Sequence, residues 1–249
     1  VSLQPQQVKG HVVFSNVSFS YTKGRPILKD ISLEAHPGEM IAIVGATGCG
    51  KTTLINLLLR FYEIDKGNIL IDDIPIQQLK RNDLRNAFAL VLQDTWLFHG
   101  TIAQNIAFGN ENASQEQIVA AAKQAYAHSF ITRLPHGYDT VYQPNMLSQG
   151  EQQLLTIARA ILSESKMMIL DEATSSIDSL TEQRIQQALQ HLTANKTSFI
   201  IAHRLSTIQA ANKILVLERG KVVEEGTHTQ LLQLNGIYAE MYHKNQTNQ

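Results

Sequence analysis

The chain has 249 residues, 43% of them hydrophobic and 17% charged, with a formal net charge of −1 at pH 7. This length can form one large α/β domain or a core with an inserted subdomain. The near-neutral charge argues against nucleic acid as a partner, because nucleic-acid-binding proteins carry a basic footprint. The single cysteine, Cys49, excludes an internal disulfide framework and fits a reducing cytosol.

No apolar run approaches the roughly 20 residues that a membrane helix needs. The first residues, Val1 to Gln7, lack the basic and apolar regions of a signal peptide, and no initiator Met precedes them. We therefore expect a piece of a longer polypeptide.

The N-terminal part of the chain predicts several short strands. In the first, apolar and polar side chains alternate, which places Val17, Phe19 and Tyr21 on one face of a half-buried strand. Together the strands predict an antiparallel sheet wrapped around the strand that precedes the glycine-rich loop described next. They are expected at residues 11–21, 27–33 and 67–71.

Residues 45–53, Gly-Ala-Thr-Gly-Cys-Gly-Lys-Thr-Thr, lie between the apolar run 40–44 and the helical pattern of 54–59. This is the strand, turn and helix context of a phosphate-binding loop. Glycines let several backbone N–H groups converge on one anion, and the helix adds the positive end of its dipole. Lys51 would reach the β- and γ-phosphates, and Thr52 would bind Mg²⁺. The residues predicted to bind a nucleoside triphosphate are Gly45, Thr47, Gly48, Cys49, Gly50, Lys51, Thr52 and Thr53.

Three later apolar runs each end in a polar residue, which is typical of parallel strands with ligand chemistry at their C-terminal ends. Between the first two runs the pattern becomes helical, with capping boxes at Ser114 and Ser148. The helix after Ser114 is predicted to run to about Ala127. A hairpin turning at Arg219-Gly220 and two short helices follow the last run. The runs are residues 88–93, 167–171 and 198–203.

Asp171 ends the second of these runs, and a second acid, Glu172, follows it directly. Phosphoryl transfer needs a carboxylate near Mg²⁺, and hydrolysis needs a group that activates water. We assign Asp171 to the metal and Glu172 to the water. Without the glycine-rich loop, the same pair would more often be the acidic first turn of a helix.

These motifs, in their order along the chain, resemble the nucleotide-binding domain of ATP-binding cassette (ABC) transporters, and the resemblance covers nearly all of the sequence. The segment from Gln93 to Ile106 resembles the exporter branch, particularly multidrug and lipid exporters. The matching elements are Tyr21, the Walker A loop at 45–52, Gln93, the signature Leu-Ser-Gln-Gly-Glu at 147–151, Walker B at 167–172, the D-loop Ser-Ser-Ile-Asp at 175–178, and His203.

The resemblance implies an α/β fold with a P-loop NTPase (RecA-like) core, an N-terminal antiparallel β subdomain and an inserted α-helical subdomain. Residues 1–249 would be one nucleotide-binding domain. Within it, residues 1–92 and 163–249 would form the β subdomain and ATP-binding core, and residues 93–162 the helical subdomain with the signature.

The resemblance also implies roles for single residues. Tyr21 would stack on adenine, Gln93 would contact Mg²⁺ and the attacking water, and His203 would bind the γ-phosphate. Each has an ordinary structural alternative: Tyr21 could simply be the last inward residue of its strand, and Gln93 a polar strand end. The cofactors would be ATP and Mg²⁺.

The family further implies partners. Two such domains pack head to tail, so that Ser148, Gln149 and Gly150 contact the ATP held by the partner. A transmembrane domain, absent from this chain, would dock a coupling helix near Trp96 to Phe98 unless those residues belong to the core. The protein would act at the cytoplasmic face of the cell membrane and export drugs or lipids.

Three departures from the family pattern are visible. The third signature residue is Gln149 instead of Gly, and the fifth is Glu151 instead of Gln. Glu151 also fits a capping box that folds it back to the Ser148 N–H, which could keep it off the phosphate; we expect its carboxylate to weaken ATP-driven dimerisation modestly. The third departure is the segment at residues 141–146, which is about two residues short and lacks the usual Glu.

Other functions remain as alternatives to the exporter motor. One is a soluble ABC-type ATPase acting on the ribosome or DNA, and another is the signature-altered half of a heterodimeric peptide or drug exporter. A third is a nucleotide sensor without turnover, against which the presence of Glu172 argues. A GTPase is disfavoured because Asn195-Lys196 and Asn212-Lys213 do not continue as a guanine-binding motif.

Overall fold

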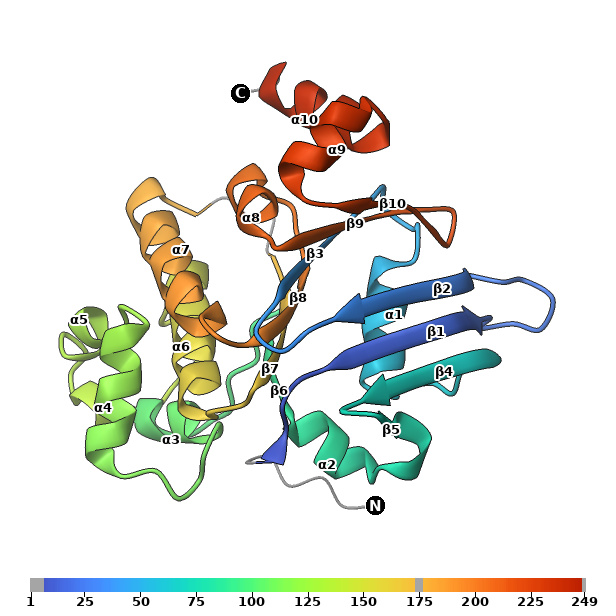
Figure 1. The fold of residues 1–249 in the computed structure, drawn as a ribbon. Helices are drawn as coiled ribbons and strands as arrows, with labels where there is room; N and C mark the ends of the chain where they lie inside the picture. The colour runs from blue at the N-terminus through green and yellow to red at the C-terminus, as the bar shows by residue number, and fades with distance from the viewer. Residues whose placement is uncertain (1–6, 173–176, 248–249) are drawn as a thin grey trace.

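The structure is a computed structural model that describes residues 7–172 and 177–247. It contains two β-sheets with helix α1 (Lys51–Leu58) packed between them, and a group of helices on the opposite face of the larger sheet (Figure 1). In the described residues, no helix is both long and apolar enough to cross a membrane.

The smaller sheet is antiparallel, as the sequence predicts, with the strand order β2-β1-β4-β5. It does not wrap around the strand of the glycine-rich loop, which belongs to the other sheet, but faces that strand across α1. Apolar side chains of both sheets and α1 share one core, including Phe14, Ile43 and Leu54. The strands are β1 (Val12–Phe19), β2 (Leu28–Ala35), β4 (Lys66–Ile71) and β5 (Ile74–Pro75).

Strand β1 is shorter and less regular than predicted. Its pairing with β2 shifts between Phe14 and Val17 and again between Val17 and Phe19, and Asn16 has a positive φ of 49°. Such bulges interrupt simple alternation. Val17 and Phe19 are buried as expected, whereas Tyr21 lies beyond the end of the strand with 49% of its surface exposed. The prediction that Tyr21 continues the inward face is therefore wrong.

The larger sheet has the order β10-β9-β3-β8-β7-β6, in which every neighbouring pair except β10 and β9 is parallel. Alternate side chains of β3 enter two cores: Ile41 and Ile43 face α1, and Ala42 and Val44 face the helices on the other side. The C-terminal ends of the parallel strands thus meet at one edge. The strands are β3 (Met40–Val44), β6 (Phe88–Val91), β7 (Met167–Asp171), β8 (Thr197–Ile201), β9 (Lys213–Glu218) and β10 (Lys221–Gly226).

The predicted helical segment lies between β6 and β7. Its longest helix, α6, packs against α3, α4, α7 and β6, and therefore shares a core with the larger sheet. Helix α4 begins at the predicted cap Ser114 but ends earlier than predicted, because Tyr126 adopts a left-handed φ of 57°. The division of the chain at 93–162 stays a prediction. The helices of the segment are α3 (Ile102–Ala107), α4 (Gln115–Gln124), α5 (His128–Ile131), the 3₁₀ helix η3 (Gly137–Asp139) and α6 (Gln149–Leu162).

The C-terminal part follows the prediction closely. The β9–β10 hairpin turns at Arg219-Gly220, where both residues have positive φ (48° and 79°), the conformation of a type I′ turn. Two helices follow and lie beyond the hairpin in Figure 1. The remaining helices are η2 (Ile76–Gln78), α2 (Arg81–Asn86), α7 (Ser179–Thr193), α8 (Leu205–Ala210), α9 (His228–Leu234) and α10 (Ile237–Thr247).

Candidate nucleotide-binding site

The glycine-rich loop joins β3 to α1 and needs backbone conformations that favour glycine. Gly45, Gly48 and Gly50 have φ values of 153°, 81° and 114°. A Cβ on Gly45 would collide with the Leu217 carbonyl and the Cys49 sulfur. Gly50, the N-cap of α1, offers no side-chain cap, so the first N–H groups of this helix remain available to an anion.

Lys51 supplies the positive charge of the loop. Its Nζ donates to the carbonyl oxygens of Gly45 (2.6 Å) and Ala46 (3.0 Å). The ammonium group is therefore held at the mouth of the loop, where phosphate oxygens would replace carbonyl oxygens as its acceptors.

An open cleft of about 530 Å³ lies in front of the loop. It combines side chains from the loop with others from the ends of β6, β7 and β8, which the parallel sheet brings to one edge. Ile27 and Ile201 also line it, and neither was predicted as a site residue. The predicted residues that line the cleft are Tyr21, Thr47, Gly48, Gly50, Lys51, Thr52, Thr53, Gln93, Asp171 and His203.

Tyr21 stands at the rim of this cleft. Its hydroxyl lies 3.2 Å from the Thr53 hydroxyl, and its ring packs edge-on against Phe19 and Tyr62, with centroids 4.9 and 5.0 Å away. The half-exposed ring is thus held in place at the rim of the cleft. Tyr62, which supports it, was not predicted as a site residue.

Asp171 lies in the cleft together with Thr52 and Gln93. Burial raises the pKa of the Asp171 carboxyl above its usual value, although the charges of His203 and Lys51 oppose this effect. Carboxylate, hydroxyl and amide oxygens are hard ligands of the kind that Mg²⁺ prefers. These three residues therefore fit a magnesium ion.

Glu172 is arranged differently from its neighbour. It is 1% exposed and does not line the cleft. Its carboxylate accepts the backbone N–H groups of His203 (2.8 Å) and Arg204 (3.0 Å) and the hydroxyl of Thr207. To activate water, the Glu172 carboxylate would have to give up some of these hydrogen bonds and reach the cleft. Thr207 was missed as a site residue; its signal was the Arg-Leu-Ser-Thr run directly after His203.

Cys49 and Gly45 are the two predicted loop residues that do not line the cleft. Both line a second cavity of about 390 Å³ that the loop forms with the β9–β10 turn and α10. The Cys49 thiol is buried, with its sulfur 3.8 Å from Lys51 Nζ, and its backbone N–H bonds to the Ala46 carbonyl within the loop. Their predicted contacts with the nucleotide stay predictions.

The signature residues lie away from the cleft. Ser148 caps α6, and the predicted capping box is confirmed: Glu151 accepts the Ser148 N–H at 3.0 Å, and Ser148 accepts the Glu151 N–H at 3.2 Å. Ser148 and Gln149 are exposed, whereas Gly150 is buried and lets α6 pack closely on Ile177 and Thr181. In a single chain, none of them lines the cleft.

The predicted D-loop lies partly outside the described residues, which include Ile177 and Asp178 but not Ser175 or Ser176. Asp178 caps α7 by accepting the Thr181 N–H at 2.9 Å.

Comparison with known proteins decides the family. Residues 28–175 match the family described as "ABC transporter". The chain belongs to the ABC transporter family. This confirms the family and the ATPase class predicted from the motifs.

Two relatives of this ABC domain carry transporter and flippase names. It is 52% identical over 234 residues to the "Fatty acid ABC transporter ATP-binding/permease protein" of Mycobacterium bovis, which covers 93% of this chain and 37% of the relative. It is 48% identical over 244 residues to the "ATP-dependent lipid A-core flippase" of Chromohalobacter salexigens, covering 97% and 42%. The chain thus spans about two fifths of the length of these relatives.

A solved structure supports the fold of the ABC domain directly. A bacterial Atm1-family ABC exporter with ATP bound superimposes with a TM-score of 0.88 at 43% sequence identity, covering 95% of this chain and 42% of the exporter chain. The predicted α/β P-loop fold is therefore confirmed.

An exposed aromatic patch of the ABC domain surrounds Trp96, which therefore does not belong to the core, the alternative that the sequence left open. Trp96 and Phe108 are 58% and 54% exposed, and Phe98 packs against both. The Arg159 guanidinium lies over the Trp96 and Phe108 rings (5.9 and 5.2 Å) and donates to the Trp96 carbonyl at 3.1 Å. The patch borders a groove of about 860 Å³. Phe108 and Arg159 were not predicted, because their meeting depends on how α3 and α6 pack.

Proposed function

We propose that this chain is the ATP-hydrolysing motor of a membrane exporter and works as a pair of domains closed head to tail around two ATP molecules. The observation that carries the proposal is that two candidate anion-binding groups lie apart on one chain. The cleft holds one set of phosphate-binding groups, while the capped N-terminus of α6 lies elsewhere on the chain.

Within one chain, Lys51 and the first turn of α1 would hold the phosphates, and Tyr21 would stack on the base. Thr52, Gln93 and Asp171 would hold Mg²⁺, which neutralises charge on the phosphates when bound. His203 would bind the γ-phosphate. Glu172 would orient and deprotonate the attacking water once its carboxylate turns toward the cleft.

The second domain would complete each site. Ser148 and Gln149 are exposed at the positive end of a 14-residue helix, where an anion is favoured. In the pair, the end of this helix would face the ATP bound to another copy or to a second, different cassette. The ATP would then contact both domains and stabilise the pair. Hydrolysis would then release the pair.

The aromatic patch at Trp96, Phe98 and Phe108 would receive the transmembrane domain. Its exposed rings and adjacent groove offer apolar area of the kind that marks interaction sites. This docking would place the domain at the cytoplasmic face of the cell membrane.

The exported substrate is proposed to be a lipid or another amphiphile, in keeping with the fatty acid transporter and the lipid A-core flippase among the relatives. A drug or peptide is the alternative. An ATPase acting on the ribosome or DNA is disfavoured, because relatives about half identical to this chain carry permease or flippase names.

Complementation between two inactive variants tests the composite site. Lys51→Ala disables phosphate binding, and Ser148→Phe blocks the end of α6, so each alone should lack turnover. A mixture should regain a fraction of the native ATPase rate, because mixed pairs contain one intact composite site. Ser114→Phe is the matched control, since Ser114 has the same capping-box position on α4. A mixture as inactive as its components would contradict the proposed pairing.

A further inference from the structure

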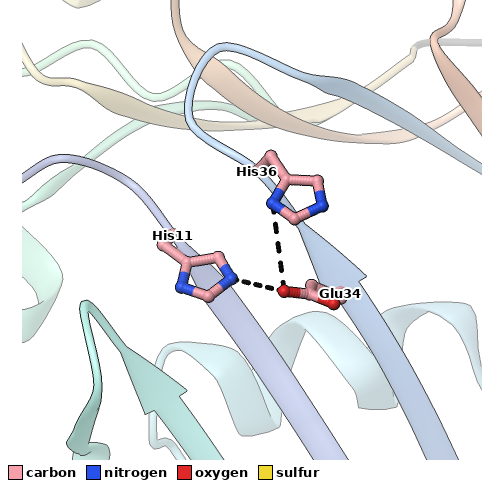
Figure 2. Close-up of side chains that lie close together, drawn as sticks. All are labelled: His11, Glu34 and His36. Carbon is pink, nitrogen blue, oxygen red and sulfur yellow. Dashed lines mark hydrogen bonds and ion pairs between the residues drawn. The ribbon is translucent and has the colours of Figure 1, made fainter.

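A cluster of two histidines and one glutamate lies at the end of the antiparallel sheet. His11 precedes β1, Glu34 is in β2, and His36 follows β2 (Figure 2). The register pairs Val13 with Glu34 and Val12 with Ala35, so that residues 11, 34 and 36 fall on the same side of the strand pair. The bulges of β1 begin beyond Phe14 and leave this end regular.

The three side chains converge on one carboxylate oxygen. His11 Nε2 lies 2.7 Å and His36 Nδ1 3.9 Å from Glu34 Oε1 (Figure 2). All three ligand atoms lie within 4.8 Å of one another. Among the described residues, this is the one group of three or more His, Cys, Asp or Glu side chains arranged in this way.

We propose that His11, Glu34 and His36 bind a divalent transition-metal ion, Zn²⁺ in the first place. Two imidazole nitrogens and one carboxylate oxygen are a donor set of zinc sites with an open fourth position. Bonds of 2.0–2.1 Å in tetrahedral geometry put neighbouring ligand atoms about 3.3 Å apart. The separations of 2.7 and 3.9 Å lie on either side of this value.

The adjustment that binding requires is small and falls on mobile groups. The side chains of Glu34 and His36 are 49% and 58% exposed, so their terminal torsions can turn without displacing a core. The two imidazole rings lie within 3° of parallel with centroids 5.5 Å apart, and one must rotate to aim its lone pair at the shared ion. The metal would replace the proton between His11 and Glu34.

The backbone that carries the ligands is already fixed. The Asp72 carboxylate accepts the N–H groups of Lys9 (2.7 Å), Gly10 (3.0 Å) and His11 (2.9 Å). The His36 N–H donates to Glu39 at 2.9 Å. Binding would therefore order side chains only, which keeps its entropic cost low.

One lysine lies beside the cluster. Lys213 donates its Nζ to the Glu34 backbone carbonyl at 2.8 Å and is paired with the Glu225 carboxylate at 3.0 Å, which offsets its charge beside the site. The cluster lies near Met40, where β3 begins, whereas the glycine-rich loop follows Val44 at its other end. Metal and nucleotide would thus bind independently.

Isothermal titration of the metal-stripped, nucleotide-free chain with ZnCl₂ tests the proposal. We expect one high-affinity Zn²⁺ per chain and a rise in melting temperature that EDTA reverses. His11→Ala and His36→Ala should each lower the zinc affinity at least about 10-fold. Removing a residue that only hydrogen-bonds to a metal ligand already costs about this much, and these two residues are ligands themselves. Glu34→Gln should also lower the zinc affinity, since it keeps the shape but removes the charge.

His136→Ala is the matched control, because His136 is another exposed histidine and lies far away in the sequence. Unchanged MgATP affinity would show that each variant is folded. A native zinc isotherm for the His11→Ala, His36→Ala double variant would overturn the proposal. So would the absence of any saturable zinc binding, or an equal loss in His136→Ala.

Discussion

His203 donates its backbone N–H to the Glu172 carboxylate at 2.8 Å, so the predicted γ-phosphate ligand and the predicted base are directly linked. Two further donors, the Arg204 N–H and the Thr207 hydroxyl, complete the setting of this buried carboxylate. A phosphate that engages His203 and shifts its backbone would loosen Glu172 in the same movement. The link offers a physical reason why hydrolysis would await a bound γ-phosphate.

Replacing Glu172 by Gln should remove turnover while leaving ATP binding. The amide oxygen can still accept the two backbone N–H groups, so the local fold is kept, but the group can no longer take a proton. We expect hydrolysis to fall by roughly 10²- to 10⁴-fold, the usual contribution of a general base. Phosphate release and nucleotide binding measure the two effects. Glu164→Gln is the control, because it removes an exposed carboxylate away from the cleft, and it should change neither hydrolysis nor nucleotide binding.

Removing the Thr207 hydroxyl should release Glu172 in part. Thr207→Val keeps the side-chain shape and leaves the two backbone donors in place. We expect a modest rise in basal ATP hydrolysis, because the carboxylate loses one restraint. A rate as low as that of Glu172→Gln would instead mean that Thr207 orients the base for the reaction.

Glu151→Gln should strengthen ATP-driven dimerisation a few-fold. Glutamine can keep the capping box with Ser148, so the variant loses only the charge that the proposed pairing would bring near the partner's phosphate, an effect on the order of 1 kcal/mol at an exposed site. Sedimentation with ATP, in the Glu172→Gln background, measures it. Glu116→Gln removes a charge from the equivalent turn of α4 and is the control. Identical dimerisation with and without the Glu151 charge, together with unchanged turnover when Glu172 is intact, would show that the capping box already keeps the carboxylate from the phosphate.

Asp171→Asn should stabilise the nucleotide-free protein at neutral pH. Because burial raises the pKa of Asp171, the folded state binds more protons than the unfolded state, and stability falls as pH rises through the folded-state pKa. Asparagine removes this penalty. Melting temperatures should be higher in the variant at neutral pH, and the difference should narrow as the pH falls toward about 4, the ordinary Asp value. A lower melting temperature at neutral pH would contradict a burial-dominated shift.

Alkylation of Cys49 should block nucleotide binding. The Cys49 residue is 7% exposed and its sulfur is 3.8 Å from Lys51 Nζ, so an adduct would displace the loop and Lys51. The burial predicts slow modification, and bound ATP should slow it further by closing the loop. Nucleotide affinity is measured before and after treatment, with Cys49→Ala as the resistant control. Full ATP affinity in the alkylated protein would disprove the effect.

What the sequence predicted best was local. The strand 40–44 and the caps Ser114 and Ser148 agree with the structure, because apolar runs and capping boxes are properties of a few neighbouring residues. The cleft could also be predicted in outline, since parallel strands of one sheet align their C-terminal ends.

Features that depend on distant contacts were not predictable. The setting of Glu172 depends on residues 31 to 35 positions later in the chain. The bulges that end β1 before Tyr21 arise from pairing with β2 and β4, and the exposed position of Phe108 depends on how α3 packs. The proposed metal site requires the β1–β2 register, which alternation alone does not fix.

The most direct measurement is the ATPase rate of the native chain as a function of its own concentration, with Glu172→Gln alongside. Composite sites between two copies predict a rate per chain that rises with concentration and then saturates, and that Glu172→Gln abolishes. A rate per chain that stays constant down to the lowest concentration, where the protein sediments as a monomer, would contradict the composite site.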